Sequence, residues 1–229
     1  MNGILYLVAT PIGNWDDITF RALRILKEAD VIVFEEYREG KRLLSHYNIP
    51  EKLNETLNEH NEEEASSRII QYLKQGKNVA LISDAGTPVF ADPGKLLARK
   101  AIAERIDLIP IPGPSSILPA LVLSGFPTDE FLFYGFLSPK SDVRLHELHL
   151  IKDVDRTIIF LEAPYRLVPL LKDISIAFGG ARLVSVAFDL TMENEQIFRG
   201  TANELYMHFE KNKIKGEFVL LVGGRPAGE

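Results

Sequence analysis

Short apolar runs that alternate with amphipathic stretches constrain this chain most. The runs are rich in Val and Ile and are bounded by polar residues, Gly or Pro, which is typical of buried parallel strands. In the first half of the chain they are Ile4–Ala9, Val31–Phe34, Val79–Ile82 and Leu108–Ile111. Helical patterns lie between them at 18–29, Glu62–Lys74 and Gly94–Ala103. This alternation predicts an α/β domain with a mainly parallel sheet.

A second series of strands and helices follows the breaker cluster Ser124–Pro127. Its predicted strands are Phe131–Phe136, Thr157–Leu161, Leu183–Phe188, Ile197–Arg199 and Glu217–Val222. Its predicted helices are Val143–Ile151, Leu167–Ala177 and Asn203–Phe209. The segments flanking 192–196 resemble a hairpin, so we expect a mixed sheet here. The sequence therefore predicts two α/β domains, residues 1–114 and 115–229.

Charge and composition exclude several classes of protein. The formal net charge is −6, so a globally basic nucleic-acid binder is excluded, although a local basic patch is not. The chain has no Cys, which excludes disulfides, thiolate zinc sites and a Cys nucleophile. No apolar run approaches the ~18 residues that a membrane span needs, and the N-terminus has no basic lead. We expect a cytoplasmic protein.

Polar or turn-forming residues follow six of the predicted strands. Ligands of open α/β sheets bind beyond the carboxyl ends of the strands, so these loops are the candidate site. They are Thr10–Asn14, Glu35–Arg38, Ser83–Pro88, Pro112–Ser116, Glu162–Arg166 and Asp189–Thr191. For any single loop, ordinary turn chemistry explains the residues equally well. Six such loops together favour a ligand cleft. The Rossmann and P-loop fingerprints are both absent.

Two other polar clusters have simple structural interpretations. His146 and His149 are spaced i,i+3 on a predicted helix, but no carboxylate partner repeats at ligand spacing, so we interpret them as a solvated helix face. We predict no metal site. Glu62, Glu63 and Glu64 are expected in the first turn of a helix, where acidic side chains complement the macrodipole.

Eight segments in order along the chain resemble one known family. They are LYLVATPIGNWDDITFRAL (5–23), EEYR (35–38), EHNE (59–62), SDAGTPVFADPG (83–94), PIPGPSSILPALVLSGFP (110–127), FLFYGFLSPK (131–140), FLEAPYRL (160–167) and KGEFVLLV (215–222). The chain resembles the tetrapyrrole methylase superfamily and, within it, the bacterial small-subunit ribosomal RNA methyltransferase I family. That family methylates a cytidine ribose 2′-oxygen.

The resemblance implies a fold, a cofactor and a set of binding residues. The fold is two α/β domains with a ligand cleft between them, the methyl donor is S-adenosylmethionine, and the assembly is a homodimer. The small-subunit rRNA or an assembled small ribosomal subunit is the implied partner. The residues implied to line the donor site are Pro11, Asp84, Ala85, Gly86, Ser115 and Ser116 from the first half, and Leu161, Glu162, Ala163, Leu190 and Gly216 from the second.

The chain departs from the family pattern at several positions. Glu36 and Tyr37 stand where Asp and Thr are usual, and Phe188 and Met192 stand where basic residues are usual. Tyr165 stands where His is frequent, and the chain ends soon after Val222, without a C-terminal segment that many members carry. These departures leave three alternatives open: a divergent paralogue, a tetrapyrrole-type small-molecule methylase, and a non-catalytic binding module.

Methyl transfer to a ribose hydroxyl requires alignment of the reacting atoms and removal of a proton. Glu36 or His60 is our candidate base, because both occupy predicted rim loops. Arg38 and Lys140 are the candidates for positioning phosphate or holding the acid. An ion pair of Arg38 with Glu35 or Glu36 is an equally good interpretation. Further candidate phosphate contacts are Lys41, Arg42, Arg144, Lys211, Lys213 and Lys215.

Overall fold

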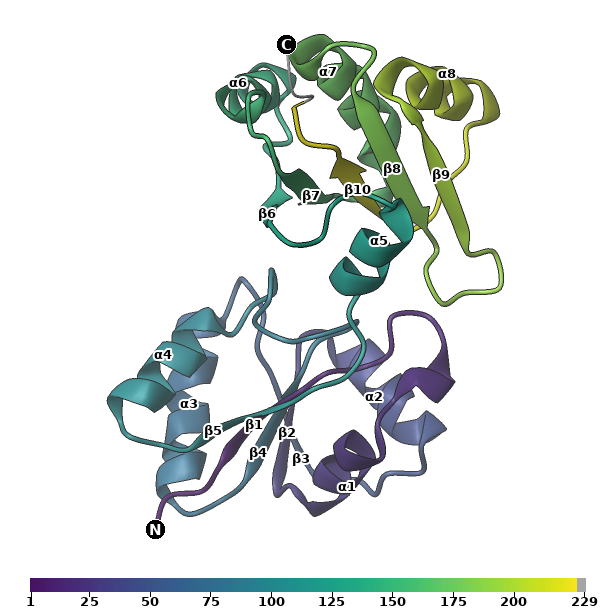
Figure 1. Ribbon diagram of the computed structural model, residues 1–229. Coiled ribbons are helices and arrows are strands. Elements are labelled where there is room, and N and C mark those ends of the chain that lie inside the picture. Colours follow the sequence, from purple (N-terminus) through teal and green to yellow (C-terminus); the bar gives the residue numbers. More distant parts are fainter. Residues whose placement is uncertain (226–229) are drawn as a thin grey trace. The chain divides into compact units, whose positions relative to one another are not determined.

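The computed structural model describes residues 1–225. The chain folds into two compact units, Met1–Ser115 and Ser116–Glu229, and each unit has its own five-stranded sheet (Figure 1). The two sheets differ in strand direction, as the sequence predicts. The first is wholly parallel, and the second is mixed. The predicted α/β class is confirmed.

The first unit is a parallel sheet with helices on both faces. Its elements are β1 (Leu5–Val8), α1 (Phe20–Glu28), β2 (Val31–Phe34), α2 (Tyr37–His46), β3 (Leu53–Thr56), α3 (Glu62–Lys74), β4 (Val79–Ile82), α4 (Lys95–Ala103) and β5 (Leu108–Ile111). The strand order is β3-β2-β4-β1-β5. Alternate residues of the buried strands enter two cores. Val31 and Val33 pack with α3 and α4, whereas Ile32 and Phe34 pack with α1 and α2.

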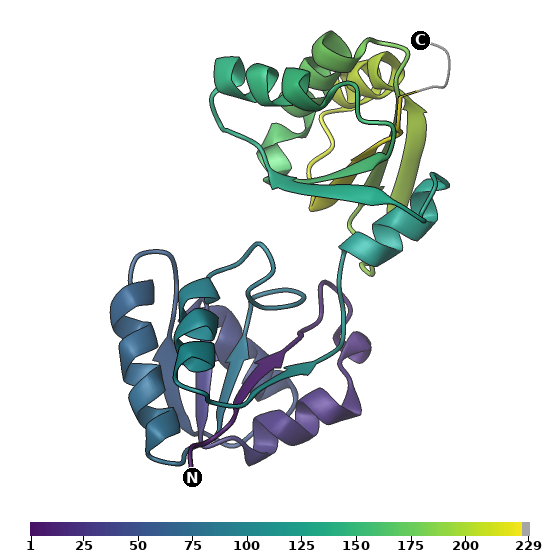
Figure 2. The same ribbon diagram turned by 60° about the vertical axis from the view of Figure 1, so that its left-hand side comes forward.

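In the second unit, three helices cover one face of the sheet and one short helix lies on the other. The elements of this unit are α5 (Ile117–Ser124), β6 (Phe131–Phe136), α6 (Ser141–Ile151), β7 (Thr157–Leu161), α7 (Leu167–Phe178), β8 (Leu183–Phe188), β9 (Gln196–Thr201), α8 (Ala202–Asn212) and β10 (Phe218–Val222), with strand order β6-β7-β10-β8-β9. The core lies between one face of the sheet and α6, α7 and α8. The short helix α5 contacts β8, β9 and β10, and its buried residues lie outside that core, so it covers the opposite face (Figure 2).

Two elements of the first unit differ from the sequence prediction. Tyr37 and Arg38 are not loop residues, because α2 begins at Tyr37. Gly40 interrupts the helical pattern of α2 for a packing reason, since a Cβ there would lie 2.1 Å from Cδ1 of Phe34. The sequence also does not predict the strand β3. It is an edge strand that pairs only with β2, and Leu53 is its only apolar residue.

Local signals explain most of the remaining boundaries. Thr19 caps α1 by accepting the Ala22 N–H at 3.1 Å, and Thr201 and Glu204 form a capping box on α8. Gly125 ends α5 with φ +75°. None of the helices within residues 1–225 combines the length and apolar character that crossing a membrane requires.

Candidate functional site

The loops that follow the parallel strands of the first unit meet at one edge of its sheet. An isolated bridge joins the β1 and β4 loops there, with reciprocal N–O distances of 2.9 and 3.0 Å between Thr10 and Gly86. The fully buried Thr10 hydroxyl also donates to the Ser83 carbonyl oxygen at 3.1 Å. The bridge therefore holds Pro11 beside the segment 84–86.

The β5 loop joins the same edge. Thr87 Oγ1 lies 3.5 Å from the carbonyl oxygen of Pro114, which is the residue before Ser115. Gly86 has φ +82°, a conformation that favours glycine. Ser116 is the N-cap of α5 and belongs to the second unit. The structure thus gathers five of the predicted donor-site residues in the first unit: Pro11, Asp84, Ala85, Gly86 and Ser115.

Two carboxylates lock the β2–α2 turn to the β4 loop. The Glu36 N–H donates to Asp84 Oδ1 at 3.1 Å, and the Asp84 N–H donates to Glu35 Oε2 at 3.4 Å. Burial raises the pKa of the Glu35 carboxyl, and the neighbouring Asp84 charge raises it further. Burial also raises the pKa of the Asp84 carboxyl. Asp84 therefore positions the start of α2 as well as facing this edge.

Asp92 is a half-buried carboxyl at the same edge, within the segment SDAGTPVFADPG (83–94). Burial, followed by the charges of Glu35 and Asp84, raises its pKa to about 7, against a hydrogen bond from Ser83 and the charge of Lys95. The first unit thus concentrates partly buried negative charge beside the β4 loop. Such a surface favours a cationic ligand group.

Glu62 fixes the far end of the β4 loop. Its Oε1 accepts the Gly94 N–H at 2.8 Å and the Leu96 N–H at 3.0 Å, so a side chain of α3 caps α4. Gly94 itself provides no side chain for this cap and has φ +110°. Val89 and Ala91 within the same loop also have positive φ, +71° and +66°. Glu62 therefore does more than complement its own helix, which the sequence did not indicate.

The candidate polar residues of the first unit lie on its surface. The Glu36 and Arg38 side chains are exposed, and Arg38 forms no ion pair with Glu35 or Glu36 among the described residues. His60 is 84% exposed, and its Nε2 lies 3.5 Å from Glu59 Oε1. The His60 backbone N–H donates to Asn58 Oδ1 at 3.1 Å within the turn before α3. These groups are open to a large substrate.

The strand register gathers the candidate residues of the second unit in the same way. Leu161 at the end of β7 pairs with Val219 of β10, and β6 ends beside it at Phe136. The end of β8, Phe188, pairs with Phe218 at the start of β10. The ends of β6, β7 and β8 and the start of β10 therefore share one edge. This edge carries Leu161, Glu162, Ala163, Leu190 and Gly216.

Asp189 links the segment that contains Leu190 to the segment that contains Gly216. Its N–H donates to the Glu217 carbonyl oxygen at 2.8 Å, and its Oδ1 accepts the Glu217 N–H at 2.8 Å. A Cβ at Gly216 would lie 2.4 Å from Asp189 Oδ1, so a larger residue there would displace the carboxylate that accepts the Glu217 N–H. Asp189 and Thr191, which flank Leu190, both have positive φ, +47° and +67°. The sequence singled out Gly216 but not the role of Asp189.

The Glu162 side chain is already paired. It is 1% exposed, and its carboxylate accepts the Ala163 N–H at 2.8 Å and lies 3.0 Å from Arg166 Nη1. The Arg166 guanidinium also lies over the Tyr165 ring at 5.6 Å. A ligand at this edge would therefore meet the backbone around Glu162 rather than a free carboxylate.

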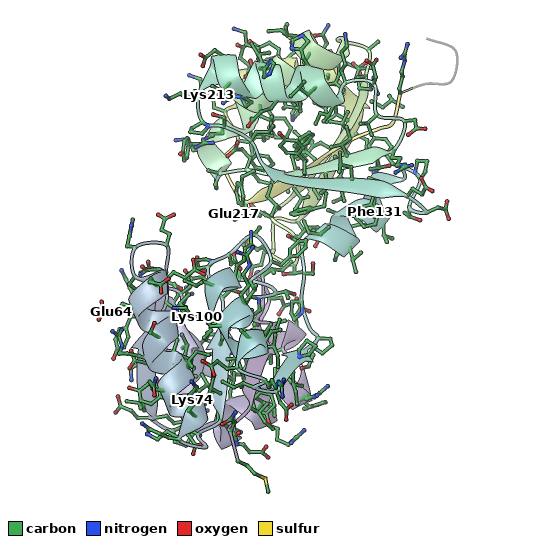
Figure 3. The ribbon with its side chains drawn as sticks, turned by 90° about the vertical axis from the view of Figure 1, so that its left-hand side faces the viewer. Glu64, Lys74, Lys100, Phe131, Lys213 and Glu217 are labelled. Carbon is green, nitrogen blue, oxygen red and sulfur yellow. The ribbon has the colours of Figure 1, made fainter. Side chains whose placement is uncertain are left out.

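The first unit also has a separate shallow groove between α3 and α4. It has a volume of about 310 Å³ and is lined by Ser67, Ile70, Gln71, Lys74, Lys100, Ala103 and Glu104. Figure 3 labels two of its lysines, Lys74 and Lys100. Both are paired, with Glu104 at 2.9 Å and with Glu63 at 2.6 Å. The groove contains none of the predicted site residues. Within residues 1–225, no group of three or more His, Asp or Glu side chains is placed to hold a metal ion.

Comparison with known proteins identifies the family. Residues 4–206 match the model of the tetrapyrrole (corrin/porphyrin) methylases. A ribosomal RNA small subunit methyltransferase I from Halalkalibacterium halodurans is 46% identical over 222 residues, which are 97% of this chain and 76% of that protein. The protein of the same name from Haemophilus influenzae is 42% identical over 231 residues, 100% of this chain and 81% of that protein.

Solved structures with this fold have more distant sequences. A diphthine synthase has a TM-score of 0.76 at 18% identity and covers 97% of this chain and 90% of its own. A uroporphyrin-III C-methyltransferase from Thermus thermophilus, solved with S-adenosylhomocysteine, has a TM-score of 0.65 at 18% identity and covers 96% and 97%. Fold, motif order and near-full-length identity agree, and the chain belongs to the tetrapyrrole methylase family and, within it, to the ribosomal RNA small subunit methyltransferase I group.

Proposed function

We propose that this protein transfers a methyl group from S-adenosylmethionine to the ribose 2′-oxygen of a cytidine in small-subunit (16S) rRNA. The observation that carries the proposal is 46% identity to a ribosomal RNA small subunit methyltransferase I over 97% of the chain. The motifs that carry this likeness lie at the strand ends of both units. The rRNA substrate comes from the names of the relatives, and the cytidine 2′-oxygen comes from the family resemblance.

The residues at the edge of the first unit fit the chemistry of the methyl donor. S-adenosylmethionine carries two positive groups, a sulfonium and an α-ammonium. Asp84 and Glu35 place partly buried negative charge at that edge, and Asp92 adds to it. Gly86 leaves the backbone of the β4 loop without a side chain there. We propose that Pro11, Ala85, Ser115 and Ser116 complete the donor site with the residues of the second unit.

The reaction asks little covalent chemistry of the protein. When bound, S-adenosylmethionine supplies an electrophilic methyl, whose bond to sulfur breaks with the electron pair leaving on sulfur as the bond to oxygen forms. The chain must hold the acceptor oxygen in line with the methyl. The proton of the 2′-hydroxyl goes to the Glu36 carboxylate or to the His60 ring. We assign Arg38 and Lys140 to the phosphates beside the acceptor, because both side chains are exposed.

An acidic chain needs help to bind RNA. The net charge of −6 opposes association with naked rRNA, and phosphate contacts must come from local cations. We therefore propose that an assembled or partly assembled small subunit in the cytoplasm is the better substrate, because shape then adds to charge. The homodimer that the family resemblance implies is part of the same proposal.

Methyl transfer from labelled S-adenosylmethionine tests the proposal directly. The acceptors to compare are small subunits from a strain lacking the gene, naked 16S rRNA, and a uroporphyrin. We expect label in the small subunits, less in naked rRNA and none in the uroporphyrin. Label in the uroporphyrin would favour the small-molecule methylase. Binding of S-adenosylmethionine by calorimetry with no label in any acceptor would favour a non-catalytic binding module.

A further inference from the structure

Several hydrogen bonds fix the segment between β6 and α6, residues 137–140. It follows β6 at the edge of the second unit where β7 also ends, so it lies at the edge that carries Leu161 and Gly216. The Ser138 N–H donates to Glu147 Oε2 at 2.8 Å, and the Lys140 N–H donates to Ser138 Oγ at 3.3 Å. The segment ends at Lys140, which is the N-cap of α6.

A buried ion pair on the helix side also holds this segment. Arg144 of α6 and Asp173 of α7 are 5% and 6% exposed, with Nη2–Oδ2 and Nε–Oδ2 distances of 2.6 and 2.7 Å. The remaining Arg144 nitrogen, Nη1, donates to the carbonyl oxygens of Ser138 at 3.2 Å and Pro139 at 3.3 Å. One guanidinium thus joins two helices to the loop, and we call Arg144 and Asp173 the brace.

Stability alone does not account for a charged pair at this place. A buried ion pair has a large desolvation cost and is often no more stabilising than apolar side chains of similar size. The surrounding core between α6, α7 and the sheet is apolar, with Leu148, Leu170 and Leu171 fully buried. What apolar side chains would not provide is a donor to the two loop carbonyls. The brace therefore sets the conformation of the loop.

The fixed loop presents an unpaired cation. Lys140 is exposed, and in the described part of the chain its ammonium has no carboxylate within ion-pair distance. A lysine whose backbone is held on both sides loses less conformational freedom when it binds an anion than one on a free loop. An exposed, unpaired ammonium on a rigid backbone suits a phosphate group.

We propose that Arg144 and Asp173 are positioning residues that hold the loop so that Lys140 contacts a phosphate of the RNA backbone. The inference rests on the proposed function, because it takes rRNA as the substrate. It assigns the brace no contact with RNA, and the predicted phosphate contact of Arg144 is wrong, because its side chain is 5% exposed and is paired with Asp173. The effect of the brace on methyl transfer is expected entirely through Lys140.

The test uses the full-length protein and a charge-neutral double variant. R144M/D173L removes one positive and one negative charge and keeps apolar volume, so the fold is retained. The matched control is R156M/E130L, which makes the same change at an exposed pair, 2.6 Å apart, beside the opposite ends of β6 and β7. K140A removes the cation itself, and K140R keeps the charge. Methylation of small subunits gives KM and kcat, and calorimetry gives the Kd for S-adenosylmethionine.

We expect K140A to raise KM for small subunits about tenfold, the loss of one charge-assisted contact, with K140R near wild type. R144M/D173L should raise KM severalfold, with kcat and the Kd for S-adenosylmethionine unchanged and the control at wild-type values. In the K140A background, R144M/D173L should not raise KM for small subunits any further. Both R144M/D173L and K140A should lower the slope of log Kd for rRNA against log salt by nearly one.

Three results would overturn the inference. They are an unchanged KM in R144M/D173L, effects of the brace and of K140A that add, and a K140A variant with wild-type KM. Each of these leaves the methyltransferase assignment intact, because the wild type remains active. A wild-type protein that binds S-adenosylmethionine but neither binds nor methylates small subunits would contradict the proposed function and the phosphate role together.

Discussion

At the scale of single residues, the fold strongly changes the ionisation of Asp92. Its pKa is about 7 in the folded protein against 3.8 for the ordinary group, because it is half-buried beside Glu35 and Asp84. Between these two values the folded state holds a proton that the unfolded state has released. The free energy of unfolding therefore falls as the pH rises from about 4 to about 7.

Replacing Asp92 with Asn should remove this contribution. At pH 8, D92N should be more stable than wild type by about 1 kcal/mol, a value reduced for solvent screening at a half-buried group, and at pH 4 the difference should vanish. Urea unfolding followed by the fluorescence of Trp15 measures it, because Trp15 is the only tryptophan and lies in the same unit. The control is D129N, which changes an exposed carboxylate in the second unit. Parallel pH profiles for D92N and wild type would contradict this account.

The base of the reaction is also a question of single residues. Glu36→Gln removes a carboxylate, and His60→Ala removes a ring, from exposed positions where a fold defect is not expected. We expect one of the two to lower the single-turnover methylation rate about a hundredfold, the lower end of the range for losing a general base. If both stay within about threefold of wild type, less than ~1 kcal/mol, neither is the base.

At the scale of elements, the sequence predicts those that follow local rules. The buried strands appear as Val- and Ile-rich runs, and Gly125, within the predicted breaker cluster Ser124–Pro127, ends α5. The edge strand β3 has too few apolar residues to form such a run. Gly40 within α2 looks like a break in the sequence, although it is there because of the Phe34 ring.

Some features of the candidate site can likewise be predicted from local sequence, and others cannot. Asp84–Gly86 and Gly216 stand out by motif, because turns and close backbone approaches need particular residues. The cap that Glu62 provides for α4 joins positions more than 30 residues apart, so no local pattern contains it. The one available signal is indirect: Gly94 begins a helix without a capping side chain, and the cap must therefore come from another segment.

This cap leads to a prediction about donor binding. Glu62→Ala leaves the Gly94 and Leu96 N–H groups without an acceptor and frees a loop that holds Val89 and Ala91 at positive φ. We expect the Kd for S-adenosylmethionine to rise about fivefold to tenfold, in proportion to roughly 1 kcal/mol for a lost cap. Glu62→Gln keeps an acceptor oxygen and should stay near wild type.

Glu64→Ala is the matched control for this prediction. Glu64 lies in the same turn of α3, is exposed, and among residues 1–225 forms its one ion pair with the half-exposed Arg68. Figure 3 labels it on α3. Calorimetry on the three variants decides the question. Equal affinities for Glu62→Ala and wild type, or an equal loss in Glu64→Ala, would show that the cap does not shape the donor site.

At the scale of the whole molecule, the two units offer different groups to the proposed reaction. The first unit brings partly buried negative charge and the β4 loop, which suit a cationic donor. The second unit brings the loop 137–140 with Lys140, which the brace holds. It also brings the turn at Gly216, where Asp189 accepts the Glu217 N–H. Each unit has its own core, so the fold of one does not depend on the other for its buried apolar contacts. The predicted ligand cleft between residues 1–114 and 115–229 stays a prediction.

Mass spectrometry of small-subunit rRNA tests most directly the proposal that this protein methylates the ribose of a cytidine there. We predict that deleting the gene removes one methyl group from the ribose of a single cytidine, and that the intact gene restores it. The gene carrying K140A should restore it only in part. An rRNA methylation profile that is identical with and without the gene, or a lost methyl that maps to a base, would contradict the account.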